Sequence, residues 1–210
     1  MAWFKRESAE LDTSGEKKVR TEGLWVKCEN CRQIIWKKDL EENMNVCPKC
    51  DKHFRIDART RLAQLLDDGQ YETFDGNLVS TDPLKFVDLK AYSKRLQQAQ
   101  EETGLNDAVI NAQGKLLGRP VVASVMEYAF IGGSMGAVVG EAITRAVERA
   151  VELRMPLIIV SASGGARMME GVVSLMQLAK ISAALARLDQ AKVPYLCIIH
   201  HHREHHAVRR

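Results

Sequence analysis

Four cysteines, arranged as two close pairs, constrain this chain more than any other feature. Cys28 and Cys31 form one Cys-x-x-Cys pair, Cys47 and Cys50 form another, and fifteen residues separate the pairs. One pair alone is weak evidence, but two at this separation match the ligand spacing of a four-cysteine zinc ribbon or treble clef. Four thiolates fill the tetrahedral shell of Zn²⁺, so we expect one structural zinc ion. We disfavour two disulfides because nothing else in the sequence indicates secretion.

Size and composition indicate a globular protein with one ordinary domain and a small module. The 210 residues are 46% hydrophobic and 27% charged, which is usual for such proteins. The first residues contain no apolar signal segment, and no apolar run approaches the roughly 18 residues of a membrane span. We therefore expect a cytoplasmic protein with no membrane partner.

Charge gives little support to a polyanionic partner. The net charge is +3, and residues 25–59 hold eight basic and six acidic side chains. This slight excess leaves no strong electrostatic footprint for nucleic acid. Because finger modules often bind nucleic acid, a zinc-ribbon nucleic-acid-binding protein is kept as the alternative function.

Composition divides the sequence into five stretches. We expect a flexible leader, a zinc-ribbon module, a helical connecting layer, an α/β domain and a histidine-rich tail at residues 1–23, 24–56, 57–106, 107–199 and 200–210. In the connecting layer, Asp57 is placed to cap a helix that Gly69 stops. A second, polar helix is expected over residues 88–103, ended by Gly104.

From residue 107 onward, short apolar runs alternate with amphipathic stretches, which predicts an α/β architecture. We expect strands at 108–110, 120–125, 157–160 and 193–199, with a turn around Gly114 and Gly118 and helices at 138–153 and 172–188. The last helix carries two adjacent apolar stripes, so we expect burial of more than half its circumference.

Two glycine-rich turns, at residues 132–136 and 163–167, lie where a strand leads into a helix. Glycine permits positive φ and lets a ligand approach the backbone, and a helix start offers N–H groups and partial positive charge. The expected ligand-binding residues are Gly133, Ser134, Gly136, Ser163, Gly164, Gly165 and Arg167. The backbone N–H groups of Gly132, Gly133, Gly164 and Gly165 are the candidates to stabilise a thioester enolate. Tight strand–helix packing is the alternative reading of either turn alone.

Other catalytic patterns are missing from the sequence. Neither turn fits the P-loop or Rossmann pattern. Ser134 and Ser163 have no companion histidine, since five of the six histidines lie in the final eleven residues. We expect Glu127 and Glu170, the acids near the turns, to be structural. The inventory suits chemistry that needs backbone amides rather than a side-chain nucleophile.

The sequence resembles the carboxyltransferase β subunit of bacterial acetyl-CoA carboxylase. The resemblance rests on residues 22–28 (EGLWVKC), the four cysteines, residues 130–136 (FIGGSMG) and residues 161–168 (SASGGARM). It runs in register to about residue 196. It implies a crotonase-like ββα superhelix, incomplete in this chain, behind the zinc ribbon. An acyl-CoA hydratase or isomerase of the crotonase type is a weaker alternative, because those enzymes carry acidic catalytic residues and no zinc ribbon.

The resemblance also implies an activity and partners. The family transfers a carboxyl group from carboxybiotin to acetyl-CoA, giving malonyl-CoA for fatty acid synthesis. The β subunit joins an α subunit in an α2β2 heterotetramer. Biotin arrives on the biotin carboxyl carrier protein, and ATP is used by the separate biotin carboxylase. Backbone amides stabilise the enolate, and no covalent enzyme intermediate forms.

The tail departs from the family. Members continue after the strand at 193–199 with a threonine-rich segment and a glycine pair that supplies an oxyanion-hole amide, whereas this chain has His200, His201, His202, His205 and His206. A purification tag, a metal-binding tail and a frameshift are the possible explanations. We favour the frameshift, because CAC histidine codons read one base later encode threonine. We therefore expect the chain as given to be inactive and poorly soluble.

Overall fold

The computed structural model describes residues 23–199, so the leader and the histidine-rich tail lie outside the described residues. The chain divides into two compact units, the first ending at Arg55 and the second beginning at Ile56.

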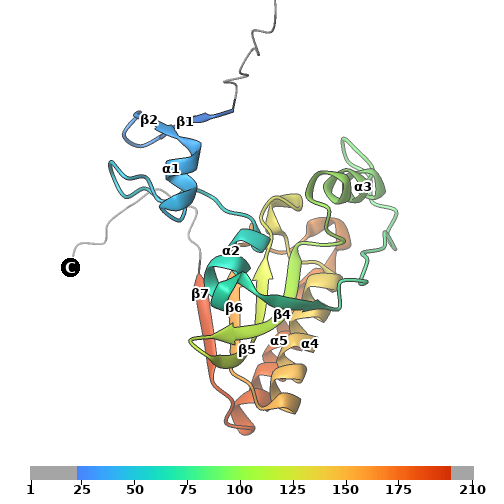
Figure 1. Cartoon of the computed structure of the whole chain (residues 1–210). Coiled ribbons are helices and arrows are strands. Elements are labelled where there is room, and N and C mark those ends of the chain that lie inside the picture. Colours follow the sequence, from blue (N-terminus) through green and yellow to red (C-terminus); the bar gives the residue numbers. More distant parts are fainter. Residues whose placement is uncertain (1–22, 200–210) are drawn as a thin grey trace, which may run out of the picture. The chain divides into compact units, whose positions relative to one another are not determined.

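The first unit is a small module that contains the four paired cysteines. Strands β1 (Trp25–Lys27) and β2 (Ile34–Trp36) pair antiparallel, and helix α1 (Lys37–Glu42) follows directly (Figure 1). Its buried side chains are two cysteines and two aliphatic residues, Cys28, Cys47, Ile35 and Leu40. So small a core cannot hold a fold by burial alone, which is the situation in which a metal ion stabilises the folded state.

The second unit is built on a five-stranded sheet of order β3-β4-β5-β6-β7. The strands are β3 (Tyr71–Phe74), β4 (Val109–Leu116), β5 (Arg119–Met126), β6 (Leu157–Ser161) and β7 (Tyr195–Ile199). The first three strands pair antiparallel, and β5, β6 and β7 pair parallel. Long helices connect the parallel strands, as parallel pairing requires.

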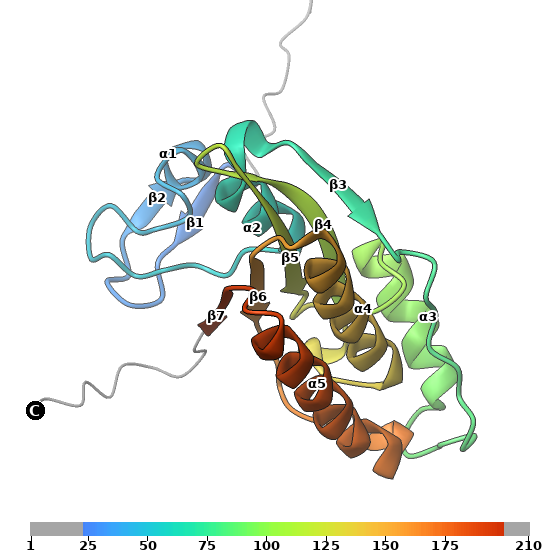
Figure 2. The same ribbon diagram turned by 90° about the horizontal axis from the view of Figure 1, so that it is seen from below.

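Helices cover both faces of the sheet. Helices α4 (Ala137–Leu153) and α5 (Val172–Gln190) lie side by side on one face (Figure 2), and α2 (Ala58–Leu65) packs on the other. Side chains alternate between the two cores: Val122 and Leu157 face α4, whereas Val121 and Ile158 face α2. The period of two along a strand therefore fills both cores from the same apolar runs. Helix α3 (Tyr92–Thr103) packs its apolar face against the α4 side.

Several sequence expectations are confirmed. Asp57 caps α2, its Oδ1 accepting a hydrogen bond of 2.6 Å from the Thr60 N–H. Gly104 ends α3 in the left-handed conformation, with φ 64°. The order of strands and helices from β4 to β7 is the expected β-β-α-β-α-β.

Other expectations are wrong. The second polar helix begins at Tyr92 rather than at residue 88, because the Asp88 carboxylate accepts a hydrogen bond from the Lys90 N–H and holds the preceding residues in a turn. Gly114 lies within β4, not in a turn. A Cβ there would lie 2.9 Å from the Gln70 carbonyl oxygen, so the glycine admits a crossing backbone.

Helix α5 is less buried than its two apolar stripes predict. Its side chains Val172, Val173, Leu175, Met176 and Leu178 are exposed, as are Tyr195, Leu196, Ile198 and Ile199 of β7. Within the described part of the chain, only the face of α5 toward α4 and the sheet is covered. Exposed apolar side chains gathered on one helix and one strand are typical of a surface that a protein partner covers. No helix in residues 23–199 is both long and apolar enough to span a membrane.

Candidate functional site

The four predicted metal ligands meet in the first unit. The sulfur atoms of Cys28, Cys31, Cys47 and Cys50 all lie within 4.8 Å of one another. The Cys28–Cys50 and Cys31–Cys47 sulfurs are 3.7 and 3.8 Å apart, far beyond the roughly 2.05 Å of a disulfide. Zn–S bonds of about 2.3 Å in a tetrahedron place the sulfurs about 3.8 Å apart. The donor set therefore fits one zinc ion.

The two cysteine knuckles share one backbone pattern. The N–H of Arg32 donates to the Cys28 carbonyl (2.8 Å), and the N–H of Asp51 donates to the Cys47 carbonyl (3.0 Å). Arg32 and Asp51, each four residues after the first cysteine of its pair, have φ near 60°. This repeated turn brings the two thiols of each pair to one side of the backbone.

The pKa values of Cys31 and Cys50 are shifted in opposite directions. Hydrogen bonds from the Asn30 side chain and the Lys52 backbone lower the pKa of Cys50 to about 6. A backbone hydrogen bond from Gln33 favours the Cys31 thiolate, but burial and the neighbouring thiols outweigh it and raise the pKa of Cys31 to about 11. A bound divalent ion favours the thiolate form of all four sulfurs, because each thiolate is then a ligand of the ion.

In the second unit, the two glycine turns lie directly against each other. The Gly164 N–H donates to the Gly132 carbonyl (2.8 Å), and the Met135 N–H donates to the Gly165 carbonyl (2.8 Å). The Arg167 N–H returns a bond to the Met135 carbonyl (2.9 Å). The turn after β5 and the turn after β6 thus form one short backbone ladder at the start of α4.

Glycine is required in these turns for two different reasons. A Cβ on Gly133 would lie 2.1 Å from the Ala162 carbonyl oxygen, and one on Gly164 would lie 2.9 Å from the Gly132 carbonyl oxygen. These two glycines let the turns touch. Gly132 and Gly165 have φ of 65° and 118°, yet open space surrounds the position of a Cβ. They leave room at the surface where a ligand can approach the backbone.

The structure narrows the set of amides available to an oxyanion. The N–H groups of Gly133, Gly164 and Gly165 donate to Phe130, Gly132 and the Ser163 hydroxyl, respectively. These three expected donors are therefore already used. Within the described residues of the two turns, the N–H groups of Gly132, Gly136, Ser163 and Ala166 have no hydrogen-bond partner. Each turn thus keeps two free amides, and those of Ser163 and Ala166 were not expected as donors from the sequence.

Arg167, expected at the ligand, is instead buried beneath the turns. Its side chain is 0% exposed, and its guanidinium forms an ion pair of 2.6 Å with Asp107. Its Nε and Nη2 donate to the hydroxyl and carbonyl oxygens of Ser134, at 3.1 and 2.8 Å. Its Nη1 donates to Asp107, Tyr92, Ser80 and Glu170. Arg167 thus binds the first turn with its side chain while its backbone belongs to the second.

Glu170 joins the same buried network to helix α4. Its Oε2 accepts a hydrogen bond of 2.6 Å from the Ala137 N–H in the first turn of α4, where negative charge is favoured by the helix dipole. Its Oε1 accepts from the Tyr92 hydroxyl at 2.6 Å. Glu127 similarly accepts from the Ala58 N–H at the start of α2 (2.7 Å). Both glutamates are buried and bind helix N-termini, which agrees with the structural role expected from the sequence.

Charge pairing dominates the ionisation of this network. Burial alone would lower the pKa of Arg167, but the hydrogen bond and charge of Asp107 outweigh burial and hold the pKa above its ordinary value. Burial raises the pKa of Tyr92, and the hydrogen bond to Glu170 adds to the rise. Arg167 stays charged and Tyr92 stays neutral at physiological pH, so the contacts persist.

Sequence reasoning did not identify Asp107 or Ser80 as part of this network. The Ser80 hydroxyl donates to Asp107 at 2.5 Å, and both side chains are buried. Residues 80, 92, 107 and 167 are far apart in the sequence and meet only through the fold. One available signal was an acid placed immediately before the apolar run that begins β4.

Comparison with known proteins agrees with both parts of the chain. The family model described as carboxyl transferase domain matches residues 66–203, and that described as acetyl-CoA carboxylase zinc finger domain matches residues 25–50. An acetyl-coenzyme A carboxylase carboxyl transferase subunit beta from Citrifermentans bemidjiense is 50% identical over 200 residues. That match covers 95% of this chain and 71% of the relative.

Two solved structures share the fold. A transcarboxylase 12S structure with methylmalonyl-coenzyme A bound is 28% identical with TM-score 0.56, and the match covers 69% of this chain and 26% of that chain. A Pseudomonas malonate decarboxylase hetero-tetramer in complex with malonate is 29% identical with TM-score 0.51, and the match covers 68% of this chain and 49% of that chain. This chain spans at most about half the length of either.

The fold and the paired turns define a crotonase-like carboxyl transferase domain, preceded in sequence by a four-cysteine zinc ribbon. The zinc ribbon is of the acetyl-CoA carboxylase type, which disfavours a nucleic-acid-binding finger as the main role. The chain belongs to the family of acetyl-CoA carboxylase carboxyl transferase beta subunits.

The two adjacent glycines of the first turn give a matched test of the packing. Gly132→Ala places a methyl group in open space and costs about 1–2 kcal/mol for a left-handed residue. Gly133→Ala has the same φ penalty and adds an overlap with Ala162, so we expect roughly 1–3 kcal/mol more. Urea unfolding of both variants measures the difference. Equal stabilities would show that the turns do not touch as described.

Proposed function

We propose that this chain supplies the acetyl-CoA-binding turns of a carboxyl transferase that moves a carboxyl group from carboxybiotin to acetyl-CoA, forming malonyl-CoA for fatty acid synthesis. The observation that carries the proposal is that the two turns, fixed against each other, both keep free amides, with Gly132 on the first turn and Ala166 on the second among them. The family membership supports the same reaction.

The proposed reaction passes through an enolate, whose negative charge has to be stabilised by the protein. When the methyl carbon of acetyl-CoA loses its proton, charge develops on the thioester oxygen. N–H groups already aimed at that oxygen stabilise the enolate, and loss of one such donor typically costs about 100- to 1000-fold in rate. The positive end of α4, which starts at Ala137 beside the turns, adds to this stabilisation.

The proposed step balances without an enzyme nucleophile. The enolate carbon forms a bond to the carboxyl carbon of carboxybiotin, and the C–N bond to biotin breaks with its electrons left on nitrogen. That nitrogen takes up the proton lost by acetyl-CoA. Ser134 accepts a hydrogen bond from Arg167, and Ser163 binds the Gly165 amide, so both hydroxyls serve the turns.

The remaining components are also proposed from the family. An α subunit joins this β-type chain in an α2β2 assembly, a biotin carboxyl carrier protein delivers carboxybiotin, and a biotin carboxylase consumes ATP, all in the cytoplasm. The exposed apolar faces of α5 and β7 supply a surface of the kind a subunit covers. Zinc holds the first unit and supplies no chemistry to the reaction, because four thiolates complete its shell.

A chimera tests the function of these residues. Residues 1–198 of this chain are followed by the remaining C-terminal segment of the 50%-identical relative and combined with that relative's α subunit. We expect carboxylated carrier protein and acetyl-CoA to give malonyl-CoA, and Gly165→Ala, which fills the space beside the free amides, to reduce the rate. A folded, zinc-loaded assembly that makes no malonyl-CoA would overturn the proposal.

A further inference from the structure

One residue of the first glycine turn has a backbone conformation that its side chain disfavours. Ile131 has φ 47°, and the two glycines that follow it have φ 65° and 63°. The Gly133 N–H donates to the Phe130 carbonyl at 2.9 Å. Ile131 and Gly132 are therefore the central residues of a hydrogen-bonded turn with positive φ at both positions, which is type I′. Asn-Gly is the usual pair there, and a β-branched residue with positive φ is an outlier that calls for a cause in its surroundings.

The Ile131 side chain is held by the core on the α4 side of the sheet. It is partly buried against this core, which includes its fully buried neighbour Phe130. Asparagine or glycine would adopt the same φ with less strain, but neither would supply an apolar side chain to the core. Burial of the side chain therefore offsets the strain, and it ties the turn to the core.

The peptide between Ile131 and Gly132 carries one of the free amides. Its carbonyl oxygen accepts a hydrogen bond from the Ser134 N–H at 3.2 Å. Because a trans peptide is planar, its N–H points in the direction opposite to its carbonyl. Fixing the Ile131 carbonyl therefore also fixes the direction of the free Gly132 N–H.

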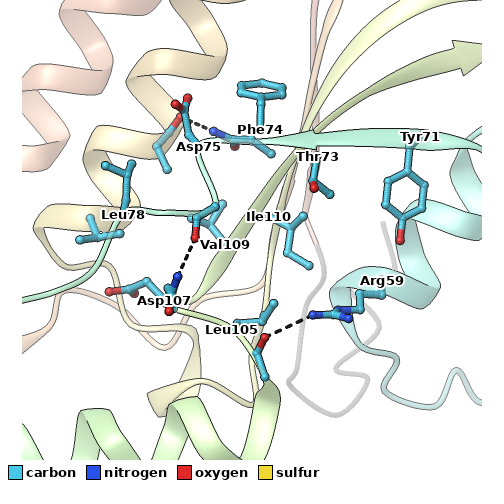
Figure 3. A pocket seen from close by; sticks show the side chains of 16 residues that line it. Arg59, Tyr71, Thr73, Phe74, Asp75, Leu78, Leu105, Asp107, Val109 and Ile110 are labelled. Carbon is cyan, nitrogen blue, oxygen red and sulfur yellow. Dashed lines mark hydrogen bonds between the residues drawn. The ribbon is translucent and has the colours of Figure 1, made fainter.

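The buried arginine network supports the same peptide from its other end. Arg167 donates to the hydroxyl and carbonyl oxygens of Ser134, at 3.1 and 2.8 Å. Arg167 is paired at 2.6 Å with Asp107, which lies just before β4 in the wall of a cavity of about 470 Å³ (Figure 3). The peptide thus has two separate supports, the packed side chain of Ile131 and the bound residue Ser134.

We propose that Ile131 is a positioning residue for the Gly132 amide: its anchored left-handed backbone holds this N–H in the direction that an enolate oxygen requires. The inference rests on the proposed carboxyl transfer. Without the anchor, the turn samples other conformations and the N–H spends less time in the productive direction. Because misalignment affects the transition state more than the bound substrate, kcat falls more than the KM for acetyl-CoA rises.

Ile131→Asn tests the anchor, because Asn-Gly keeps the type I′ turn and removes the side chain that packs on the core. In the chimera combined with the relative's α subunit, it should lower kcat about 10- to 100-fold. The KM for acetyl-CoA should change by less than about twofold. Ile131→Val keeps a β-branched apolar side chain and should keep most of the native kcat.

Leu117→Asn is the matched control. Leu117 and Gly118 form a turn of the same type between β4 and β5, with φ 52° and 75°. Leu117 is 87% exposed and lies at the opposite end of β5 from the glycine turn. Leu117→Asn should raise the midpoint of urea unfolding, since asparagine fits the turn better, and should leave kcat unchanged. Ile131→Asn gains the same backbone relief but loses packing, so its midpoint should be the lower of the two.

The ¹⁵N heteronuclear NOE of Gly132 reports on the anchor independently of activity. In the zinc-loaded chimera it should fall in Ile131→Asn and keep its native value in Leu117→Asn. The proposal is overturned if Ile131→Asn keeps the native kcat, or if it leaves the Gly132 NOE unchanged. A native chimera that makes no malonyl-CoA would instead overturn the proposed function, and the NOE would still decide whether Ile131 holds the amide.

Discussion

Chelation of zinc should unfold residues 24–55 and leave the second unit folded. The first unit has a buried core of two cysteines and two aliphatic side chains, and structural zinc supplies about 10–16 kcal/mol in comparable small modules. All three tryptophans, Trp3, Trp25 and Trp36, lie in the first 36 residues. Tryptophan fluorescence therefore reports on the first unit, and far-UV circular dichroism reports mainly on the helices of the second.

Two cysteine variants, one in each unit, test this prediction and supply its control. Cys28→Ser should reproduce the effect of chelation, with loss of zinc from about one ion per chain. Cys197→Ser, in strand β7 of the second unit, should keep zinc and the native fluorescence. Full zinc content in Cys28→Ser, or unchanged fluorescence after chelation, would refute the structural role of the metal.

Replacement of Arg167 by methionine should destabilise the second unit by about 3–5 kcal/mol, because it leaves the carboxylates of Asp107 and Glu170 buried without their cation. Such a loss is a large part of the roughly 5–15 kcal/mol that stabilises a domain. Arg167→Lys keeps the charge but loses the fork that contacts both oxygens of Ser134. It should therefore fall between methionine and the native residue.

Urea unfolding measures this effect against a matched surface arginine. Arg145 pairs with Asp75 and Glu141, but its side chain is 41% exposed, and exposed pairs contribute about 0–1 kcal/mol. Arg145→Met should accordingly cost little. If Arg145→Met and Arg167→Met destabilise equally, the buried network does not hold the turns together.

Local patterns in the sequence were sufficient to predict the four metal ligands and the positions of the two glycine turns. The cysteine spacing specifies the four ligands, because each knuckle is built from consecutive residues. The caps at Asp57 and Gly104 were equally readable. Strand β3 could not be predicted from the sequence, since only Tyr71 and Phe74 of its four residues are apolar.

Long-range contacts set the limit of sequence reasoning at the candidate site. Arg167 follows a glycine turn and was expected to face a ligand, yet Asp107, Ser80 and Tyr92 surround it in the folded chain. No periodicity in the sequence places these residues together. Likewise, the choice between Gly133 and Gly132 as a free amide depends on a contact with Phe130 that only the folded turn reveals.

Titration with acetyl-CoA of the ¹⁵N-labelled, zinc-loaded chimera, in which residues 1–198 are followed by the relative's C-terminal segment, tests most directly whether the paired turns bind the thioester. The largest amide shifts should fall on Gly132 and Ala166, and coenzyme A without the acetyl group should shift these two amides less. Gly165→Ala should reduce both shifts. Acetyl-CoA binding that leaves both turns unperturbed, or equal shifts with coenzyme A at Gly132 and Ala166, would contradict the assignment.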